Sequence, residues 1–207
     1  MPYGTFKTVL EVAEKFGIEE ADATNFIGTL KFEVLEIDIT RLKKRLSEKA
    51  SFVSEEAICE RIISRILELL DDHYTDFLVW SHIAYNVDEK NDLAGKPDFL
   101  VAPKTKQGRM DVPPLCIIEA KRQDWEEGWA QALAEMYAAS TQGANICYAV
   151  VTSGKAWEFG KLNKGVFTKD PNQISATDNL QKVFDTLNWL FNEVDKIIKS
   201  KGKEERI

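Results

Sequence analysis

Two acidic residues and one lysine have the types and spacing of a metal-dependent hydrolytic site. Asp98 and Glu119 are separated by 20 residues, and Lys121 lies two residues after the glutamate. A short apolar run adjoins each acid, at residues 99–102 and 115–118, and runs of this length bounded by Pro and Gly indicate buried strands. Adjacent strands would bring two carboxylates and an ammonium together. Such oxygen ligands suit Mg²⁺, and a nearby lysine can orient or deprotonate a water, which is equipment for phosphodiester hydrolysis.

The side chains of Glu119 and Lys121 are expected to point the same way. Residues two apart on a strand share a face, so Ile118 and Ala120 should face a core on the other side. A glutamate and a lysine at the end of an apolar run would be costly if they were merely buried. They therefore form either an ion pair at a solvated sheet edge or part of a functional cleft, and the residues alone leave both open.

The pattern around these residues predicts an α/β fold. Apolar periodicity and turn residues indicate helices at residues 5–16, 20–30, 41–50, 54–72, 124–142 and 177–199, and strands at 31–39, 77–87, 96–102, 115–120 and 145–152, with a hairpin at 156–159 and 165–168. This order fits a small mixed β-sheet flanked by helices on both faces, with an N-terminal helical extension.

The motif and its surroundings resemble a known superfamily. Residues 97–98 (PD) followed by 119–121 (EAK) look like the PD-(D/E)XK motif of restriction-endonuclease-like nucleases, and the order of elements over 54–170 is similar. The run 119–122 (EAKR), with 128–131 (GWAQ) downstream, is similar to stand-alone bacterial members of unknown role. The motif is short, so the order of elements carries most of the resemblance.

The resemblance implies roles for the motif residues. In that family the equivalents of Asp98 and Glu119 bind the divalent metal, Mg²⁺ or Mn²⁺, and the backbone carbonyl between Glu and Lys, here Ala120, completes the metal shell. The lysine, here Lys121, positions or activates the attacking water. On this interpretation residues 1–50 are an N-terminal helical extension packed on the core. Residues 51–200 then form the nuclease-like domain with a restriction-endonuclease-like core, and 201–207 a charged tail.

A further acidic residue is selected by helical phase. At about 100° per residue, Glu55 falls on the apolar face that contains Ile62 and Ile66, whereas Glu56 falls nearer the solvent side. The family usually carries an acidic residue on the helix before the sheet, so the resemblance implies Glu55 as an additional ligand. The alternative is that Glu55 follows a Ser54 N-cap and only complements the helix dipole.

Gln131 is the last candidate site residue. It shares a helix face with Glu135 and with two alanines, Ala134 and Ala138, and small residues would let this face approach the sheet closely. In related nucleases a glutamine at this place supports the site or contacts substrate. An exposed Gln/Glu pair on a solvated face is the alternative.

Charge and cysteine usage limit the function classes. The net charge of −7 argues against a protein that coats nucleic acid, but the basic residues of 101–122 outnumber the acidic ones: Lys104, Lys106, Arg109, Lys121 and Arg122 against Asp111 and Glu119.

The three cysteines are expected to be small buried hydrophobes in a reducing compartment. Neither a catalytic thiol nor a zinc site is favoured, because no CxxC pair exists and only His73 and His82 could help.

The sequence therefore predicts an Mg²⁺- or Mn²⁺-dependent nuclease, with DNA as the default substrate by resemblance. The alternative is a non-cleaving nucleic-acid- or protein-binding module on the same fold. No base-reading element is evident, so specificity would come from the 104–114 loop, the N-terminal extension, a homodimer or a protein partner.

No apolar run reaches the ~20 residues that span a bilayer and no signal peptide is evident, so a cytoplasmic protein without a membrane partner is expected.

Overall fold

A computed structural model describes residues 3–204 of the chain. Within this range the strands form one mixed sheet of eight, in the order β1-β7-β6-β5-β4-β3-β2, with β8 also paired to β6. The strands are β1 (Glu19–Glu20), β2 (Leu78–Ser81), β3 (Phe99–Ala102), β4 (Cys116–Ala120), β5 (Ile146–Thr152), β6 (Ala156–Asn163), β7 (Val166–Lys169) and β8 (Ile174–Ser175).

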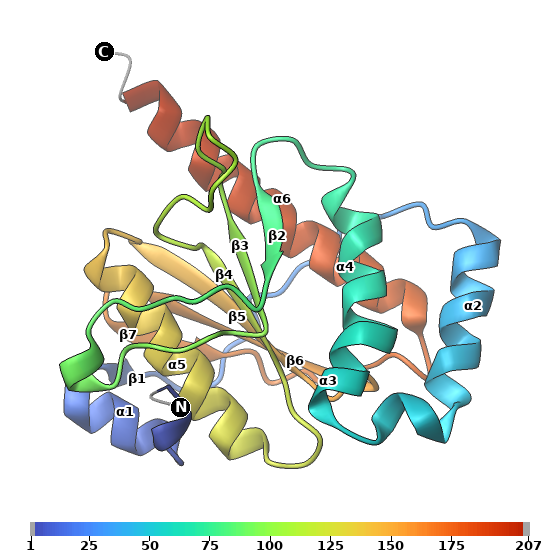
Figure 1. Cartoon of the computed structure of the whole chain (residues 1–207), viewed down its shortest axis with the longest axis horizontal. Coiled ribbons are helices and arrows are strands. Elements are labelled where there is room, and N and C mark those ends of the chain that lie inside the picture. The colour runs from blue at the N-terminus through green and yellow to red at the C-terminus, as the bar shows by residue number, and fades with distance from the viewer. Residues whose placement is uncertain (1–2, 205–207) are drawn as a thin grey trace.

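Helices flank this sheet, as Figure 1 shows. They are α1 (Val9–Phe16), α2 (Glu36–Ser47), α3 (Glu55–Ile58), α4 (Ser64–Asp71), α5 (Trp125–Thr141) and α6 (Leu180–Glu204). A π-helical segment, Cys59–Ile63, joins α3 to α4 without a break, and short 3₁₀ turns lie at Tyr3–Thr5, Lys49–Phe52 and Glu89–Asn91. The predicted α/β class with a mixed sheet flanked by helices is confirmed.

The central strand β5 shows how the two faces of the sheet are covered. Val151 lies against Gly128 of α5, whereas the ring of Tyr148 meets the ring of Trp189 in α6 with their centroids 6.4 Å apart. Residues of odd and even number on one strand point to opposite faces. Helix α5 therefore covers one face and α6 the other, in front of and behind the sheet in Figure 1.

Strand directions explain why α5 lies where it does. Strands β4 and β5 are parallel neighbours, and α5 is the crossover between them. Asp124 caps this helix by accepting a hydrogen bond from the backbone N–H of Glu127. Strands β3 and β4 are antiparallel, with Phe99 opposite Ile118, so the start of β3 and the end of β4 meet at one edge of the sheet.

The sequence prediction was wrong for residues 20–39. Apart from β1, residues 21–35 have neither the predicted helix nor the predicted strand, and α2 begins only at Glu36. Side chains from elsewhere satisfy this backbone: the Asp170 carboxylate accepts from the N–H groups of Phe26 and Ile27, and Asp185 accepts from that of Phe32. These bonds replace the ladder or helix that local pattern suggested.

The N-terminal segment and the C-terminal helix differ in detail from the predicted domain bounds. The first 50 residues hold α1 and α2, but β1 in the same segment pairs with β7 and so adds to the main sheet. Helix α6 continues to Glu204, inside the predicted tail, and residues 205–207 lie outside the described range. Within residues 3–204 no helix is long and apolar enough to cross a membrane.

Candidate active site

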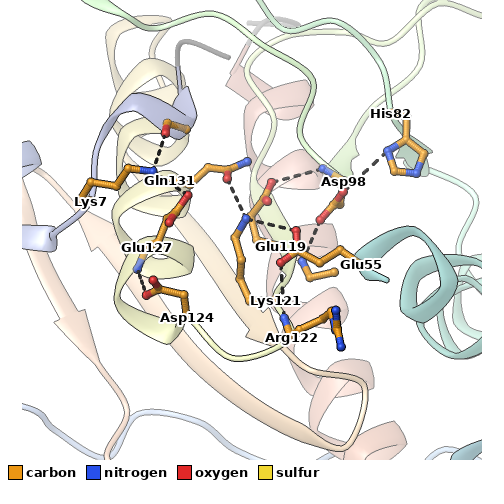
Figure 2. A network of polar contacts seen from close by, with 12 residues as sticks. Lys7, Glu55, His82, Asp98, Glu119, Lys121, Arg122, Asp124, Glu127 and Gln131 are labelled. Carbon is orange, nitrogen blue, oxygen red and sulfur yellow. Dashed lines mark hydrogen bonds and ion pairs between the residues drawn. The ribbon is translucent and has the colours of Figure 1, made fainter. Parts of the chain in front are cut away.

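The two acids of the motif lie together where β3 begins and β4 ends. The backbone N–H of Asp98 donates to Glu119 Oε1 at 3.2 Å, and the backbone N–H of Ala120 donates to Asp98 Oδ2 at 2.8 Å. Each carboxylate thus accepts a hydrogen bond from backbone beside the other, as Figure 2 shows for the close-up of this region. The antiparallel pairing of the strands fixes this arrangement.

Lys121 is the first residue beyond β4 and remains tied to the sheet. Its backbone N–H donates to the carbonyl of Thr152 at 2.8 Å. Its Nζ donates to Gln131 Oε1 at 3.2 Å and lies 3.6 Å from Glu55 Oε2. The side chain is only 11% exposed, and Glu119 is 1% exposed, so the two residues do not form an ion pair at a solvated edge.

Glu55 reaches the site from α3. Ser54 caps this helix, and Glu55 occupies its first turn, as the dipole interpretation requires. Its carboxylate nevertheless extends away from its own helix: Oε1 accepts from the backbone N–H of Arg122 at 3.4 Å, and Oε2 faces Lys121. Glu56 is exposed. The inward phase expected for Glu55 and the outward phase expected for Glu56 agree with these positions.

Gln131 and Glu135 extend the network into the interior. Gln131 Nε2 donates to Glu135 Oε1 at 3.3 Å, while its Oε1 accepts from Lys121. Glu135 is completely buried, so the alternative prediction of an exposed Gln/Glu pair on a solvated face is wrong. Among the described residues, Glu135 Oε2 meets no hydrogen-bond partner. A buried carboxylate oxygen in this condition is costly and points to a missing proton or positive charge.

A glycine lets α5 lie close enough for these contacts. A Cβ added at Gly128 would lie 2.7 Å from Lys121 Cγ and 2.9 Å from Val151 Cγ1. Any larger residue would therefore push the helix or the lysine away. The predicted small face at Ala134 and Ala138 is buried in the same helix.

The acids of the site resist ionisation. Burial raises the pKa of Glu119, and the negative charges of Glu135 and Asp98 raise it further. Burial also raises the pKa of Glu135, to about 8, and that of Asp98. For Lys121, burial lowers the pKa, but the negative charges of Glu119, Glu55 and Asp98 outweigh it and hold the pKa above its usual value. Two buried acids and the partly buried Asp98 therefore share one nearby ammonium.

This donor set fits a hard divalent cation. The carboxylates of Asp98 and Glu119, with the Ala120 carbonyl that the resemblance assigns, form an all-oxygen set of the kind that Mg²⁺ and Mn²⁺ prefer. A cation there would offset the mutual repulsion of the buried acids.

Two residues at the site escaped the sequence prediction. His82, which was not among the predicted site residues, places Nδ1 3.7 Å from Asp98 Oδ1, and Cys59, expected as a small buried hydrophobe, is buried beside the same aspartate. Cys59 lies four residues after Glu55 on one helical run, so helical phase could have indicated it. The position of His82 depends on how β2 ends and had no local signal.

The basic residues of the 101–122 segment do not all lie near the acids of the site. Because β3 and β4 are antiparallel, their connecting loop, with Lys104, Lys106 and Arg109, lies at the end of these strands opposite to Asp98 and Glu119. At ~3.3 Å per residue, this end is more than ~10 Å away. Of the five basic residues counted, Lys121 and Arg122 are at the site, so the 104–114 loop is not part of it.

A pocket beside the site contains other basic groups. It has a volume of about 250 Å³ and is lined by Phe52, Ile58, Arg122, Gln123, Ser153 and Lys155. Lys155 Nζ lies 4.3 Å from the centre of the Phe52 ring, in a cation–π contact. Trp129, by contrast, is buried and bonded to Glu158, so it does not offer a stacking surface.

Comparisons with protein-family models and with curated proteins found no match to this chain.

Proposed function

We propose that the protein is a metal-dependent nuclease that hydrolyses phosphodiester bonds, with DNA as its substrate. The observation that carries the proposal is the position of Lys121: its ammonium is held beside the buried Glu119 and the partly buried Asp98, whose carboxylates converge from neighbouring strands. Structural ion pairs rarely place three acids around one lysine in the interior, because the desolvation cost is high. Such clusters of perturbed pKa values are typical of functional sites.

The residues divide the chemistry among themselves. Asp98 and Glu119, with the Ala120 carbonyl, would hold Mg²⁺ or Mn²⁺, and Glu55 would add a carboxylate from the α3 side. When bound, the cation supplies positive charge for the phosphate and lowers the pKa of water. The raised pKa of Lys121 keeps it an ammonium, so this side chain donates hydrogen bonds that orient the attacking water or a phosphate oxygen. Gln131 fixes the direction of the ammonium.

The surrounding fold supports a restriction-endonuclease-like core. The motif acids lie on β3 and β4, α5 crosses over to β5, and α3 supplies an acid from the helix before the sheet. The pocket with Arg122 and Lys155 adjoins the site and offers two cations to a phosphate backbone, with Phe52 available to a base.

The test is cleavage of plasmid and single-stranded DNA by the purified full chain in Mg²⁺ or Mn²⁺. Asp98→Asn and Lys121→Met should each lower the rate by roughly 10²- to 10⁴-fold. Asp22→Asn, a matched change at an exposed residue, should cut like the wild type. Equal cleavage by wild type and Lys121→Met would indicate a contaminating nuclease and would remove Lys121 from the mechanism.

Thermal unfolding separates this function from the non-cleaving alternative. Mn²⁺ at 100 times its dissociation constant should stabilise the wild type by ~2.7 kcal/mol, and Asp98→Asn by much less. Stabilisation without cleavage of any substrate would favour the binding module. If Mn²⁺ gives no stabilisation and the protein cleaves no substrate, the metal site itself is excluded.

A further inference from the structure

Cys59, His82 and Asp98 bring three different ligand atoms to one place. The thiol sulfur, an imidazole nitrogen and a carboxylate oxygen all lie within 4.8 Å of one another. Donor atoms around one tetrahedral Zn²⁺ are roughly 3.3–3.7 Å apart, given Zn–S and Zn–N bonds of about 2.3 and 2.0 Å. His82 Nδ1 and Asp98 Oδ1 are 3.7 Å apart, at the upper end of this range.

The backbone of each residue is fixed by its element. Cys59 opens the π-helical segment, and π turns of this kind inside α-helices are frequent at functional sites. His82 has φ of 51°, which is uncommon for a residue other than glycine, and its backbone N–H donates to the Asp98 carbonyl at 3.0 Å. The conformation therefore turns the chain at the end of β2 and holds the imidazole beside Asp98 (Figure 2).

The two oxygens of Asp98 have different surroundings. Asp98 Oδ2 is occupied by the Ala120 N–H, which leaves Oδ1 facing His82. The imidazole is about half exposed, at 49%, whereas Cys59 is buried at 1%, so the group is open to solvent on the histidine side and closed on the cysteine side. A site with three protein ligands and one open position is the arrangement that Zn²⁺ takes with a water.

We propose that Cys59, His82 and Asp98 form a binding site for a thiophilic divalent cation such as Zn²⁺. Sulfur and imidazole ligands favour Zn²⁺ over Mg²⁺, whereas the all-oxygen set of Asp98 and Glu119 favours the harder ion. Because Asp98 belongs to both sets and its Oδ2 already accepts from the Ala120 N–H, both cations would use Oδ1 and would compete for it. Zn²⁺ is therefore an inhibitor of the Mg²⁺-dependent reaction, and this second statement rests on the proposed function.

Cobalt titration tests the site without any assay of activity. Co²⁺ replaces Zn²⁺ in such sites and gives a thiolate-to-cobalt absorption band in the near ultraviolet when a cysteine ligates it. The wild type should show this band, and Zn²⁺ should abolish it. Cys59→Ser should lose it, whereas Cys116→Ser and Cys147→Ser, matched changes at the other buried cysteines, should keep it.

His82→Asn provides a second variant that does not alter the core. Asparagine tolerates the positive φ of this position, and the side chain is half exposed, so the fold should be retained. Its affinity for Co²⁺ should fall by at least about 10-fold, because even the loss of a partner that only orients a metal ligand costs about 10- to 100-fold. A wild type without the band, or an undiminished band in Cys59→Ser, would overturn the proposal.

Inhibition by Zn²⁺ tests whether the two sites compete, and its outcomes distinguish failure of the zinc-site proposal from failure of the nuclease proposal. In Mg²⁺, micromolar Zn²⁺ should suppress DNA cleavage by the wild type, and His82→Asn should need about tenfold more Zn²⁺ for the same effect. Equal sensitivity of the two proteins would refute the competition. If the wild type cuts nothing, the nuclease proposal fails, while the cobalt spectrum still decides whether the zinc site exists.

Discussion

At the level of single residues, the protonation state of Lys121 depends on competing effects of its surroundings. Burial alone would favour the neutral amine, but Glu119, Glu55 and Asp98 favour the ammonium and prevail. A lysine in this condition is a poor proton acceptor in the absence of other cations. Its role is therefore better described as donation of hydrogen bonds and charge than as removal of a proton from water.

Glu55 and Glu56 offer a matched test of the helical-phase argument. Glu55→Gln removes the carboxylate charge 3.6 Å from Lys121 and should raise the Mn²⁺ concentration for half-maximal cleavage by about tenfold, because one oxygen ligand is weakened. Glu56→Gln, one residue away but exposed, should leave it unchanged. The measurement is a metal titration of initial rates. An equal shift in both variants would mean that Glu55 acts only through the charge of its helix terminus.

The sequence was informative about residues whose partners are close along the chain. Asp98, Glu119 and Lys121 stand beside apolar strands, so their convergence could be inferred from strand alternation. Glu135 and His82 could not be assigned in this way. The burial of Glu135 depends on how α5 packs on the sheet, and the position of His82 depends on a backbone conformation at the end of β2.

At the level of elements, the distance between α5 and β5 controls the site. Gly128 is the closest point, since an added Cβ would fall within 3 Å of both Lys121 and Val151. The same helix carries Gln131 and Glu135 one and two turns later. Any outward movement of α5 at Gly128 therefore loosens the contact between Gln131 and Lys121.

Gly128→Ala should impair the site more than the fold. The added methyl displaces the Lys121 side chain or the helix, so the rate of cleavage should fall at least tenfold, while overpacking costs about 1–3 kcal/mol of stability. Rates and urea unfolding would be measured on the same samples. Adding Val151→Ala should recover part of the activity, because it frees space beside the new methyl. Gly4→Ala, where an added Cβ meets nothing within 4 Å, is the control, and a loss of rate there equal to that of Gly128→Ala would contradict the packing argument.

Element prediction succeeded where periodicity reflected burial and failed where side chains satisfied the backbone. The helix at α5 and strands β3 to β5 bury continuous apolar runs, and their predicted positions agree with the structure within a few residues. Residues 20–39 have similar apolar alternation. There, Asp170 and Asp185 accept the backbone N–H groups from far along the chain, and no local pattern reports such bonds.

At the level of the whole molecule, the topology concentrates acidic groups in the interior of a chain that is already negatively charged. The net charge is −7, and the basic 104–114 loop is at the far end of β3 and β4 from the site. Local cations near the acids therefore come from Lys121, Arg122 and the Lys155 pocket. An anionic substrate that contacts Arg122 and Lys155 in this pocket should bind with a strong dependence on salt.

The buried acids also predict how global stability changes with pH in the absence of divalent metal. Folded Glu135 keeps its proton up to about pH 8, whereas in the unfolded chain it titrates near its ordinary value of 4.5. Between these values the folded state binds more protons than the unfolded one, so the free energy of unfolding falls as pH rises, by up to ~1.4 kcal/mol per pH unit for each excess proton. Glu119, whose pKa is raised by burial, adds to the same slope.

Urea unfolding in a chelator between pH 5 and pH 8 measures this slope. Glu135→Gln should reduce the slope and raise stability at pH 8, because a neutral amide replaces one of the acids that must ionise in the interior. Glu14→Gln, at an exposed position, should reproduce the wild-type slope. Mn²⁺ should stabilise the wild type more at pH 8 than at pH 5, since protons compete with the cation for the same carboxylates. A slope in Glu135→Gln equal to that of the wild type would show that Glu135 is ionised in the folded protein, and a proton on its Oε2 would then be excluded.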